Sequence, residues 1–443
     1  MSVVYFLLIF FFMVGIHEWG HYRMALALKI KVEAFSIGMG PTVLSWKSKT
    51  SNILYTFKAL PLGGFVAFQK SDLAKEGEDV SAAFDLQPIY KRALVVAAGP
   101  AMNLVLAVVL MFVVGLMGTN KMDAVITGVV EDSLVDNAGF EIGDKIVSIN
   151  GVEVKSLNDF GPNLLASAGD YTSIYVENKD TDGSMERILD LTNFKLSRSG
   201  TGFPTFDMGF VFPTYVDFTV NSITEQSDLL KDGVQPGDRL LEVNNKKVHY
   251  LLQLEDEIEK NPLKEVELKF ARGNNIFVTN TRPYFDNDSG SYVLGLLFED
   301  NKIYDSYFKT ERYGVIDAMN YGVEKTIFYS TITVQFIKRL FTGDISFNMI
   351  SGPVGIAKAS EKAASLGLIV FMSFGAMLSA NIAVMNLIPL PGLDGGHLLL
   401  YAVEAIRRKR LSEVVEKYLM RITMILIIVL LVSSLYIDFK YSI

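Results

Sequence analysis

The chain has no cysteine among its 443 residues. This absence excludes a disulfide-stapled scaffold, a thiolate metal site and a cysteine nucleophile. Charge is scarce too, since only 20% of the residues are Asp, Glu, Lys or Arg, below the roughly 25% of ordinary soluble proteins. The net charge of −8 argues against a nucleic-acid-binding protein, which is usually basic. Half of the residues are hydrophobic and the mean hydropathy is +0.30, so a disordered or wholly soluble chain is disfavoured.

The sequence contains four long apolar stretches. Each is long enough to cross about 30 Å of hydrocarbon as a helix, and they cover residues 1–28, 93–118, 366–390 and 419–437. The first lacks the basic start and the small-residue cleavage site of a signal peptide. The sequence therefore predicts four membrane spans, with two spans plus buried core helices as the alternative.

The loop charges orient these spans. Nine Lys and Arg residues lie in the loop 29–92 and five in the segment 407–417, whereas the other flanks carry four close to a span. Basic loops stay in the cytoplasm, so both termini and residues 120–365 are expected outside. Residues 315–337 are fairly apolar but contain three charges, each costing about 3 kcal/mol at a bilayer centre. We interpret this stretch as an amphipathic helix on the outer interface.

The outer section contains a repeat. SLVDNAGFEIGDKIVSING at 133–151 matches SDLLKDGVQPGDRLLEVNN at 227–245 with a constant offset of 94 residues. A fixed offset of domain size indicates a duplicated domain. The pattern resembles the PDZ domain of bacterial proteases, and strands at 208–212 and 294–298 resemble those that pair with a peptide. Structural domains with blocked grooves are the alternative.

The clearest chemical motif is His17-Glu18-Trp19-Gly20-His21, an H-E-x-x-H sequence at the end of the first span. On a helix, residues four apart share a face, so both imidazoles can hold one Zn²⁺. Glu18 is adjacent and can act as the general base for an attacking water. Ionisable residues at membrane depth are costly and usually functional.

Two histidines do not complete such a site, because a catalytic zinc typically has three protein ligands and one open position. The third span runs into NIAVMNLIPLPGLDGGH at 381–397. Asp394 follows a proline-broken helix there, and the Gly395-Gly396 pair lets the backbone come close. His397 is the rival ligand. Asp394 could instead, or in addition, cap the helix that follows it.

The two motifs together resemble the double signature of the site-2 protease family of intramembrane zinc proteases. The second motif reads N-x-x-P-x-P-x-L-D-G-G from Asn386 to Gly396. Other stretches similar to the family are 35–46, 60–68, 98–103 and 351–357, so the resemblance covers essentially the whole chain.

The resemblance implies a role for each matching residue. His17, His21 and Asp394 would bind Zn²⁺, and Glu18 would activate the water. Asn386 would hold the substrate backbone or stabilise the oxyanion. Its alternative is an interhelical hydrogen bond within the third span, and Asn381 is expected mainly to pack.

The stretch 60–68 would form a β-hairpin that dips toward the site. Its Gly63, Gly64 and Phe65 would present an edge to the substrate, because a helical substrate must be unwound before its peptide bond can be attacked. An ordinary cytoplasmic hairpin is the alternative. The implied substrates are single-span proteins already trimmed on the periplasmic side, namely the anti-sigma factor of the envelope stress response and remnant signal peptides. The implied location is the bacterial inner membrane, with the PDZ pair as a size filter.

The expected fold is a polytopic α-helical membrane protein with four spans and two tandem periplasmic PDZ domains. The alternative functions are a zinc transporter or metal sensor, which would not need Glu18, and an inactive PDZ scaffold, which would not need the intact ligand set.

The sequence predicts the following order of segments. The first half has a first span with the H-E-x-x-H motif (1–28), a cytoplasmic loop with the re-entrant hairpin (29–92), the second span (93–118) and two PDZ domains (122–215 and 216–300). The second half has the interfacial segment (301–365), the third span (366–390), the L-D-G-G motif with a cytoplasmic loop (391–418) and the fourth span (419–437).

Overall fold

The computed structural model describes residues 2–73, 78–130, 132–178, 183–195, 205, 208–212, 217–248, 254, 257–258, 262–273, 275–286, 291–299, 308–409 and 412–441. Its contacts divide the chain into two units. Unit 1 contains Met1–Thr119, Glu311–Ile337 and Ile350–Ile443, and unit 2 contains Asn120–Thr310 and Lys338–Met349.

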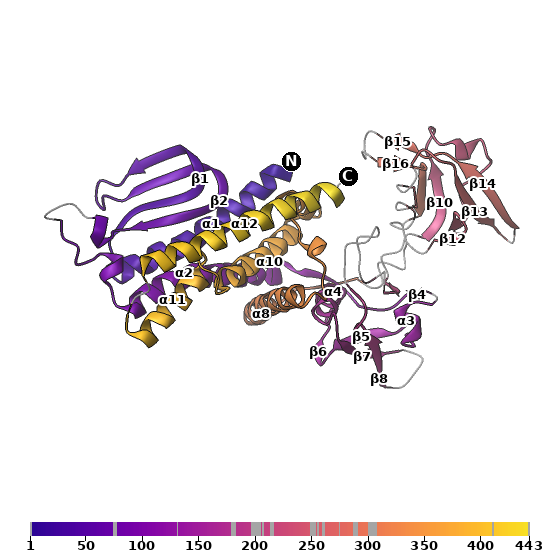
Figure 1. Cartoon of the computed structure of the whole chain (residues 1–443). Helices are drawn as coiled ribbons and strands as arrows, with labels where there is room; N and C mark the ends of the chain where they lie inside the picture. Colours follow the sequence, from indigo (N-terminus) through magenta and orange to yellow (C-terminus); the bar gives the residue numbers. More distant parts are fainter. Residues whose placement is uncertain are drawn as a thin grey trace. The chain divides into compact units, whose positions relative to one another are not determined.

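Unit 1 is mainly helical (Figure 1). Within the described residues, four of its helices are long and apolar enough to cross a membrane, which confirms the four predicted spans. These four are α1 (Ser2–Ala27), α2 (Ile89–Met117), α10 (Leu368–Leu387) and α12 (Glu413–Tyr441). The others are α8 (Val315–Thr342), α9 (Pro353–Ser365) and α11 (Asp394–Arg407), with short 3-10 turns η1 (Ser71–Leu73) and η2 (Phe84–Leu86).

Two helix boundaries differ from the expected spans for clear physical reasons. α2 begins at Ile89, directly after Pro88 and four residues before the predicted start, because charged residues such as Arg92 limit an apolar span but do not end a helix. α10 ends at Leu387, three residues early, just before the segment with Pro389 and Pro391; the residue before a proline is disfavoured in the helical region. The segment predicted as a loop after Asp394 instead contains α11.

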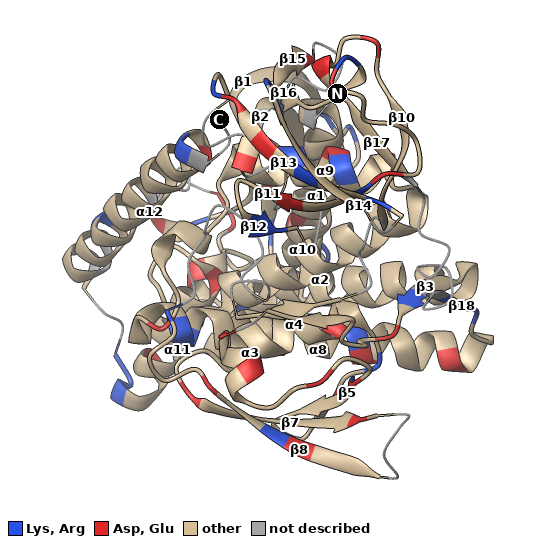
Figure 2. Cartoon of the chain, turned by 90° about the vertical axis from the view of Figure 1, so that its right-hand side faces the viewer, with Lys and Arg blue, Asp and Glu red and all other residues tan. Residues whose placement is uncertain are grey.

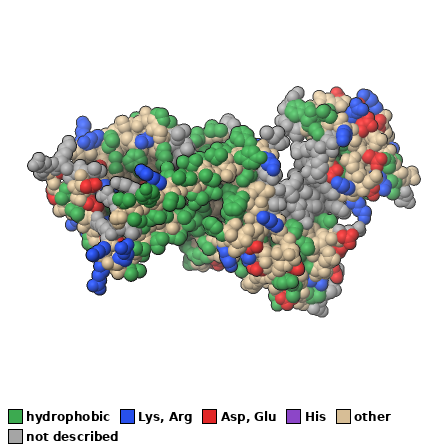
Figure 3. Space-filling view, in the orientation of Figure 1, with side chains coloured by type: hydrophobic (Ala, Val, Ile, Leu, Met, Phe, Trp, Pro, Cys, Tyr) green, Lys and Arg blue, Asp and Glu red, His purple; other side chains and the backbone are tan. Residues whose placement is uncertain are grey.

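The helices of unit 1 expose apolar side chains to their surroundings. Figure 3 shows hydrophobic side chains gathered over these helices, and most of α12 carries no charge (Figure 2). Ile422, Ile425 and Val432 of α12 are each about three-fifths exposed. A large exposed apolar surface marks a membrane or partner contact, in agreement with the spans.

α8 packs against α2 through small residues. Ala318 lies against Gly115, and Gly322 faces the backbone of Val108 so closely that a side chain there would meet its carbonyl oxygen at 2.7 Å. Further along α8, the Thr333 hydroxyl donates to Asn381 Oδ1 at 2.6 Å. Asn381, expected mainly to pack, therefore also accepts an interhelical hydrogen bond. The interfacial position predicted for this helix stays a prediction.

The C-terminal helix holds α9 in place. Asp438 of α12 is fully buried, and its carboxylate accepts hydrogen bonds from the backbone N–H groups of Gly352 (3.0 Å) and Gly355 (2.9 Å). A carboxylate at a helix N-terminus satisfies donors that the helix itself leaves unpaired. α9 packs in turn on α1.

A sheet of two long, bent strands, β1 (Val32–Lys47) and β2 (Leu54–Phe68), follows α1. Residues 34–37 of β1 pair with both 54–57 and 64–67 of β2. Within the described residues, 64–67 pair on one side only and so form an edge of the sheet. The stretch 60–68, predicted as a β-hairpin, thus lies within the single strand β2.

Unit 2 contains two copies of one arrangement of strands. The first has the sheet order β6-β5-β7-β8, with β4 paired to β9, and the second has the order β14-β13-β11-β10-β17, with β12 paired to β11. The first copy consists of β4 (Gly128–Val129), α3 (Leu134–Asn137), β5 (Lys145–Ile149), β6 (Val152–Glu153), α4 (Leu157–Ala166), β7 (Tyr171–Glu177), β8 (Ser184–Asp190) and β9 (Phe210–Val211). The second consists of β10 (Asp217–Ile223), η3 (Asp228–Leu230), β11 (Arg239–Val243), β12 (Lys246–Lys247), β13 (Val266–Arg272), β14 (Asn275–Thr281), β15 (Tyr284–Asp286), β16 (Ser291–Val293) and β17 (Leu296–Glu299). The remaining elements are β3 (Thr119–Met122), paired with β18 (Phe308–Glu311), and η4 (Phe347–Met349).

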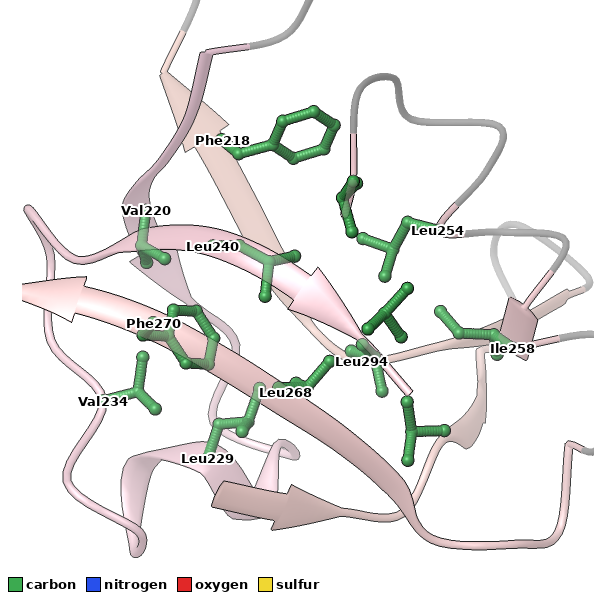
Figure 4. Close-up of a cluster of buried hydrophobic side chains, with 13 residues drawn as sticks. Phe218, Val220, Leu229, Val234, Leu240, Leu254, Ile258, Leu268, Phe270 and Leu294 are labelled. Atoms are coloured by element: carbon green, nitrogen blue, oxygen red, sulfur yellow. The ribbon is translucent and has the colours of Figure 1, made fainter. Parts of the chain in front are cut away.

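Equivalent hydrogen bonds recur 94 residues apart, as the repeat predicts. The side chains of Asn150 and Asn244 each accept from the backbone N–H of the neighbouring strand, that of Ser173 (2.9 Å) and of Glu267 (3.1 Å). Both asparagines have φ of 48°. The predicted short helix is α3 in the first copy but a 3-10 turn in the second. The second copy has its own apolar core, in which Leu240, Leu268 and Phe270 lie together (Figure 4).

Candidate metal centre

The last turns of α1 present the H-E-x-x-H side chains. The apolar run that begins at Ser2 continues as one helix through His21 to Ala27. One helical turn separates His17 from His21, and their Nε2 atoms lie 3.2 Å apart. Both imidazoles therefore face the same point, as the spacing predicted.

Asp394 reaches this point from the other end of the sequence. After α10 ends, the chain turns back on itself, and Gly395 and Gly396 lie directly against the backbone carbonyls of Leu387 and Leu390. A side chain at either glycine would overlap that backbone, so only glycine permits the reversal. The turn makes Asp394 the first residue of α11, and no side-chain hydrogen bond caps that helix.

The three side chains form a compact cluster. Asp394 Oδ2 lies 3.1 Å from His17 Nε2 and 3.5 Å from His21 Nε2. Within the described residues, His17, His21 and Asp394 are the only group of at least three His, Asp or Glu side chains with metal-ligand spacing. Ligand bonds of about 2.0–2.1 Å in a tetrahedral zinc site put ligand atoms roughly 3.3–3.4 Å apart. The observed separations of 3.1–3.5 Å fit that geometry.

The electrostatics of the cluster also suit a cation. Asp394 Oδ2 is buried and makes no hydrogen bond of good geometry with the described part of the chain, although two ring nitrogens are close. Burial alone would raise the pKa of Asp394, but the two neighbouring imidazoles outweigh it and lower the pKa to about 2. The cluster is therefore an anionic carboxylate beside two nitrogen ligands, which is a donor set that zinc prefers.

α2 supplies contacts that the motifs did not reveal. Gly99 lies against both imidazoles, and a side chain there would overlap His21. Gly20 packs against the backbone of Ala98 in the same way. These glycines let α1 and α2 approach closely at the metal cluster. The signal that could have found Gly99 is its place in AGPAMN at 98–103, which resembles the family.

Glu18 lies between the metal cluster and the β-sheet. Its side chain is buried, and Gly64 of β2 packs on it so closely that a Cβ there would lie 2.7 Å from Glu18 Cγ. The same Cβ would lie 2.6 Å from the backbone oxygen of Ser36. The sheet edge formed by 64–67 thus begins directly beside the candidate general base.

The remaining candidate residues are not members of the three-residue cluster. Asn386 is in the last turn of α10, half-buried, and its amide makes no hydrogen bond with the described residues. Gly63 has φ of +105°, and Phe65 is exposed beneath the Lys58 ammonium, 4.9 Å from its ring centroid. His397 lies on α11 with its ring 6.5 Å from that of Tyr401, and it is not part of the three-residue cluster.

An ion pair fixes α11 against α2. Arg92 Nη2 donates to Glu404 Oε1 at 2.7 Å, and both side chains are largely buried. The Arg92 guanidinium also lies over the Tyr401 ring, 4.8 Å from its centroid. Because α11 begins with Asp394, this pair holds the helix that carries the third member of the cluster.

Comparison with known proteins identifies the family of this chain. The sequence profile of Peptidase family M50 matches residues 5–430. The chain belongs to peptidase family M50. As an M50 peptidase it places both halves of its candidate site, α1 and the segment at Asp394, inside the matched region.

Curated M50-like relatives match over nearly their full length. "Regulator of sigma E protease" of Haemophilus influenzae is 30% identical over 437 residues, which cover 96% of each chain. "Putative zinc metalloprotease" of Vibrio cholerae is 29% identical over 438 residues, again 96% of each chain. "Protease RseP" of Yersinia pestis is 28% identical over 452 residues, covering 99% of each chain.

Proposed function

We propose that this chain is an intramembrane zinc metalloprotease of the site-2 type. The observation that carries the proposal is the convergence of His17, His21 and Asp394, with Glu18 buried beside them. Family membership and the zinc metalloprotease names of relatives support the metal and the reaction class. Glu18 and the adjacent sheet edge favour hydrolysis over metal transport, because transport would need neither.

In this proposal each residue has one task. His17 Nε2, His21 Nε2 and Asp394 Oδ2 hold the zinc. When bound, zinc acts as a Lewis acid toward the scissile carbonyl and lowers the pKa of water to about 7. Glu18 takes a proton from the attacking water as the water oxygen bonds to the carbonyl carbon. Glu18 then delivers that proton to the leaving nitrogen as the C–N bond breaks.

Substrate contacts come from the sheet edge and from α10. Within the part of the chain that the structure describes, residues 64–67 have a strand on one side only, so their other side can pair with an extended segment. Gly63, Gly64 and Phe65 begin that edge. The Asn386 amide is a donor for the substrate backbone or for the oxyanion. Support for this assignment comes from the packing of Gly64 on Glu18 and from the free amide of Asn386 within the described residues.

We further propose the substrates and the location. The Haemophilus influenzae relative is named for regulation of sigma E, which supports the anti-sigma factor of the envelope stress response as a substrate, with remnant signal peptides as a second class. Both would be single-span proteins already trimmed on the periplasmic side. The protein would be a multi-pass protein of the bacterial inner membrane, with both termini and the repeated domains periplasmic. The two copies in unit 2 would be PDZ domains that act as a size filter or bind peptides.

The decisive experiment compares Glu18→Gln with the parent protein on a trimmed single-span substrate. We expect the variant to keep its zinc and to lose cleavage, because the ligands remain while the proton acceptor is gone. Glu33→Gln, at an exposed position of β1, is the matched control and should cut normally. Full activity of Glu18→Gln would overturn the protease assignment of this site.

A further inference from the structure

Asn103 is a buried polar residue beside the metal cluster to which no role has been given. It lies on α2 one helical turn after Gly99, the residue that packs on both imidazoles. Its side chain is fully buried, and its Nδ2 lies 3.4 Å from His17 Nδ1. Its Oδ1 has no hydrogen-bond partner in the described part of the chain. A buried amide oxygen without a partner is costly, by about 1–3 kcal/mol, and calls for an explanation.

The tautomer of His17 decides which end of the amide faces the imidazole. A neutral imidazole carries its proton on one ring nitrogen, and the other nitrogen has the free lone pair. If His17 binds a metal through Nε2, its Nδ1 carries the proton and becomes a donor. Two donors cannot face each other, so an amide N–H cannot be the group next to Nδ1. A half-turn of the Asn103 amide exchanges its nitrogen and oxygen at the same positions, because the two ends have nearly the same shape. It then presents Oδ1 to the Nδ1–H.

His21 shows the same arrangement with a main-chain acceptor. Its Nδ1 lies 2.8 Å from the carbonyl oxygen of Val95. A carbonyl can only accept, so His21 carries its proton on Nδ1, and its Nε2 lone pair points to the cluster. Val95 and Asn103 are both residues of α2, eight positions apart. One helix thus has an oxygen-bearing group, a main-chain carbonyl or a side-chain amide, beside each imidazole.

We propose that Asn103 is a positioning residue for the metal centre. Its Oδ1 accepts the Nδ1–H of His17 and so keeps the Nε2 lone pair directed at the zinc. This inference rests on the proposed function, since it takes His17 as a ligand. Groups that hold the outer nitrogen of a metal-binding histidine typically change metal affinity by 10–100-fold when removed.

The test measures the zinc dissociation constant of the purified full-length protein by competition with a chromophoric chelator. Asn103→Leu keeps the size of the side chain but removes the acceptor, and should weaken zinc binding about 10–100-fold. Asn103→Asp keeps an acceptor oxygen and should bind zinc within a few-fold of the parent protein. Ser379→Ala is the matched control, because the Ser379 hydroxyl donates to the backbone oxygen of Asn103 at 2.8 Å and does not contact His17.

Each outcome decides a separate question. Parental affinity in Asn103→Leu would overturn the inference, and so would an equal loss in Asn103→Asp, which would indicate packing alone. Should the Leu variant fail to fold, the Asp variant still decides, since a tenfold or greater loss in it contradicts the role of the acceptor oxygen. His17→Ala is measured in parallel. If it leaves zinc binding unchanged, the metal site itself is wrong, whereas loss in His17→Ala with no change in Asn103→Leu refutes only the inference about Asn103.

Discussion

Gly64→Ala probes the contact between the sheet edge and the candidate general base. The added Cβ would lie 2.6 Å from the Ser36 backbone oxygen and 2.7 Å from Glu18 Cγ, where ordinary contacts begin at 3.4 Å. Something must therefore move by about 0.7–0.8 Å. Ser36 is paired with Phe65 in the sheet, so its carbonyl is held by the strand ladder. The Glu18 side chain has rotatable bonds and can move away from the new Cβ, whereas relief of the overlap with Ser36 requires the backbone at Gly64 to shift, which also displaces the sheet edge beside Glu18.

A misplacement of 1 Å at a catalytic group can cost about 100-fold in rate. A shift of this size at Glu18 should slow cleavage by roughly 10–100-fold, equivalent to about 1.4–2.7 kcal/mol in the activation barrier. Zinc content should stay at the parental level, because the atoms nearest to the added Cβ belong to Ser36 and Glu18 and not to a candidate ligand.

The assay is cleavage of a trimmed single-span substrate by the purified variant at saturating substrate, with zinc measured on the same sample. Gly161→Ala is the control for a glycine-to-alanine change, since a Cβ at this helical position meets nothing within 4 Å. A rate for Gly64→Ala within about threefold of the parent would refute the contact argument. Loss of zinc would refute the expectation that the Glu18 position can be disturbed without affecting the candidate zinc ligands.

Three further changes test other parts of the molecule. Asp394→Asn should lower zinc content far more than His397→Ala, measured by elemental analysis, because only Asp394 lies in the cluster; the reverse order would make His397 the third ligand. Arg92→Leu or Glu404→Leu alone should cost about 3–5 kcal/mol by removing one partner of a buried ion pair. In the double variant, thermal unfolding should show that most of this loss is recovered, and additive losses would contradict a direct pair. Deleting residues 125–300 should leave cleavage of a trimmed substrate largely intact and permit cleavage of an untrimmed one; continued refusal of the untrimmed substrate would rule out the size filter.

Several features of this protein can be predicted from local sequence alone. The four spans can be predicted from the length and hydropathy of single helices, because neither property depends on contacts with distant residues. The common direction of His17 and His21 follows from the helical period. The duplication in unit 2 follows from a constant offset, and equivalent hydrogen bonds at Asn150 and Asn244 bear it out.

Tertiary structure decided what depends on residues far apart in the chain. The sequence left Asp394 and His397 as rival ligands, and the reversal packed around Gly395 and Gly396 is what directs the carboxylate to the two imidazoles. The pair Arg92–Glu404 joins residues 312 positions apart, and no local pattern links them. In the sequence, Gly99 and Asn103 are two small or polar residues of an apolar helix, and their roles become visible only in the packing of α1 against α2. Their structural roles depend on the close contact between the two helices, because steric fit and hydrogen bonding depend on the neighbouring residues as much as on the residue itself.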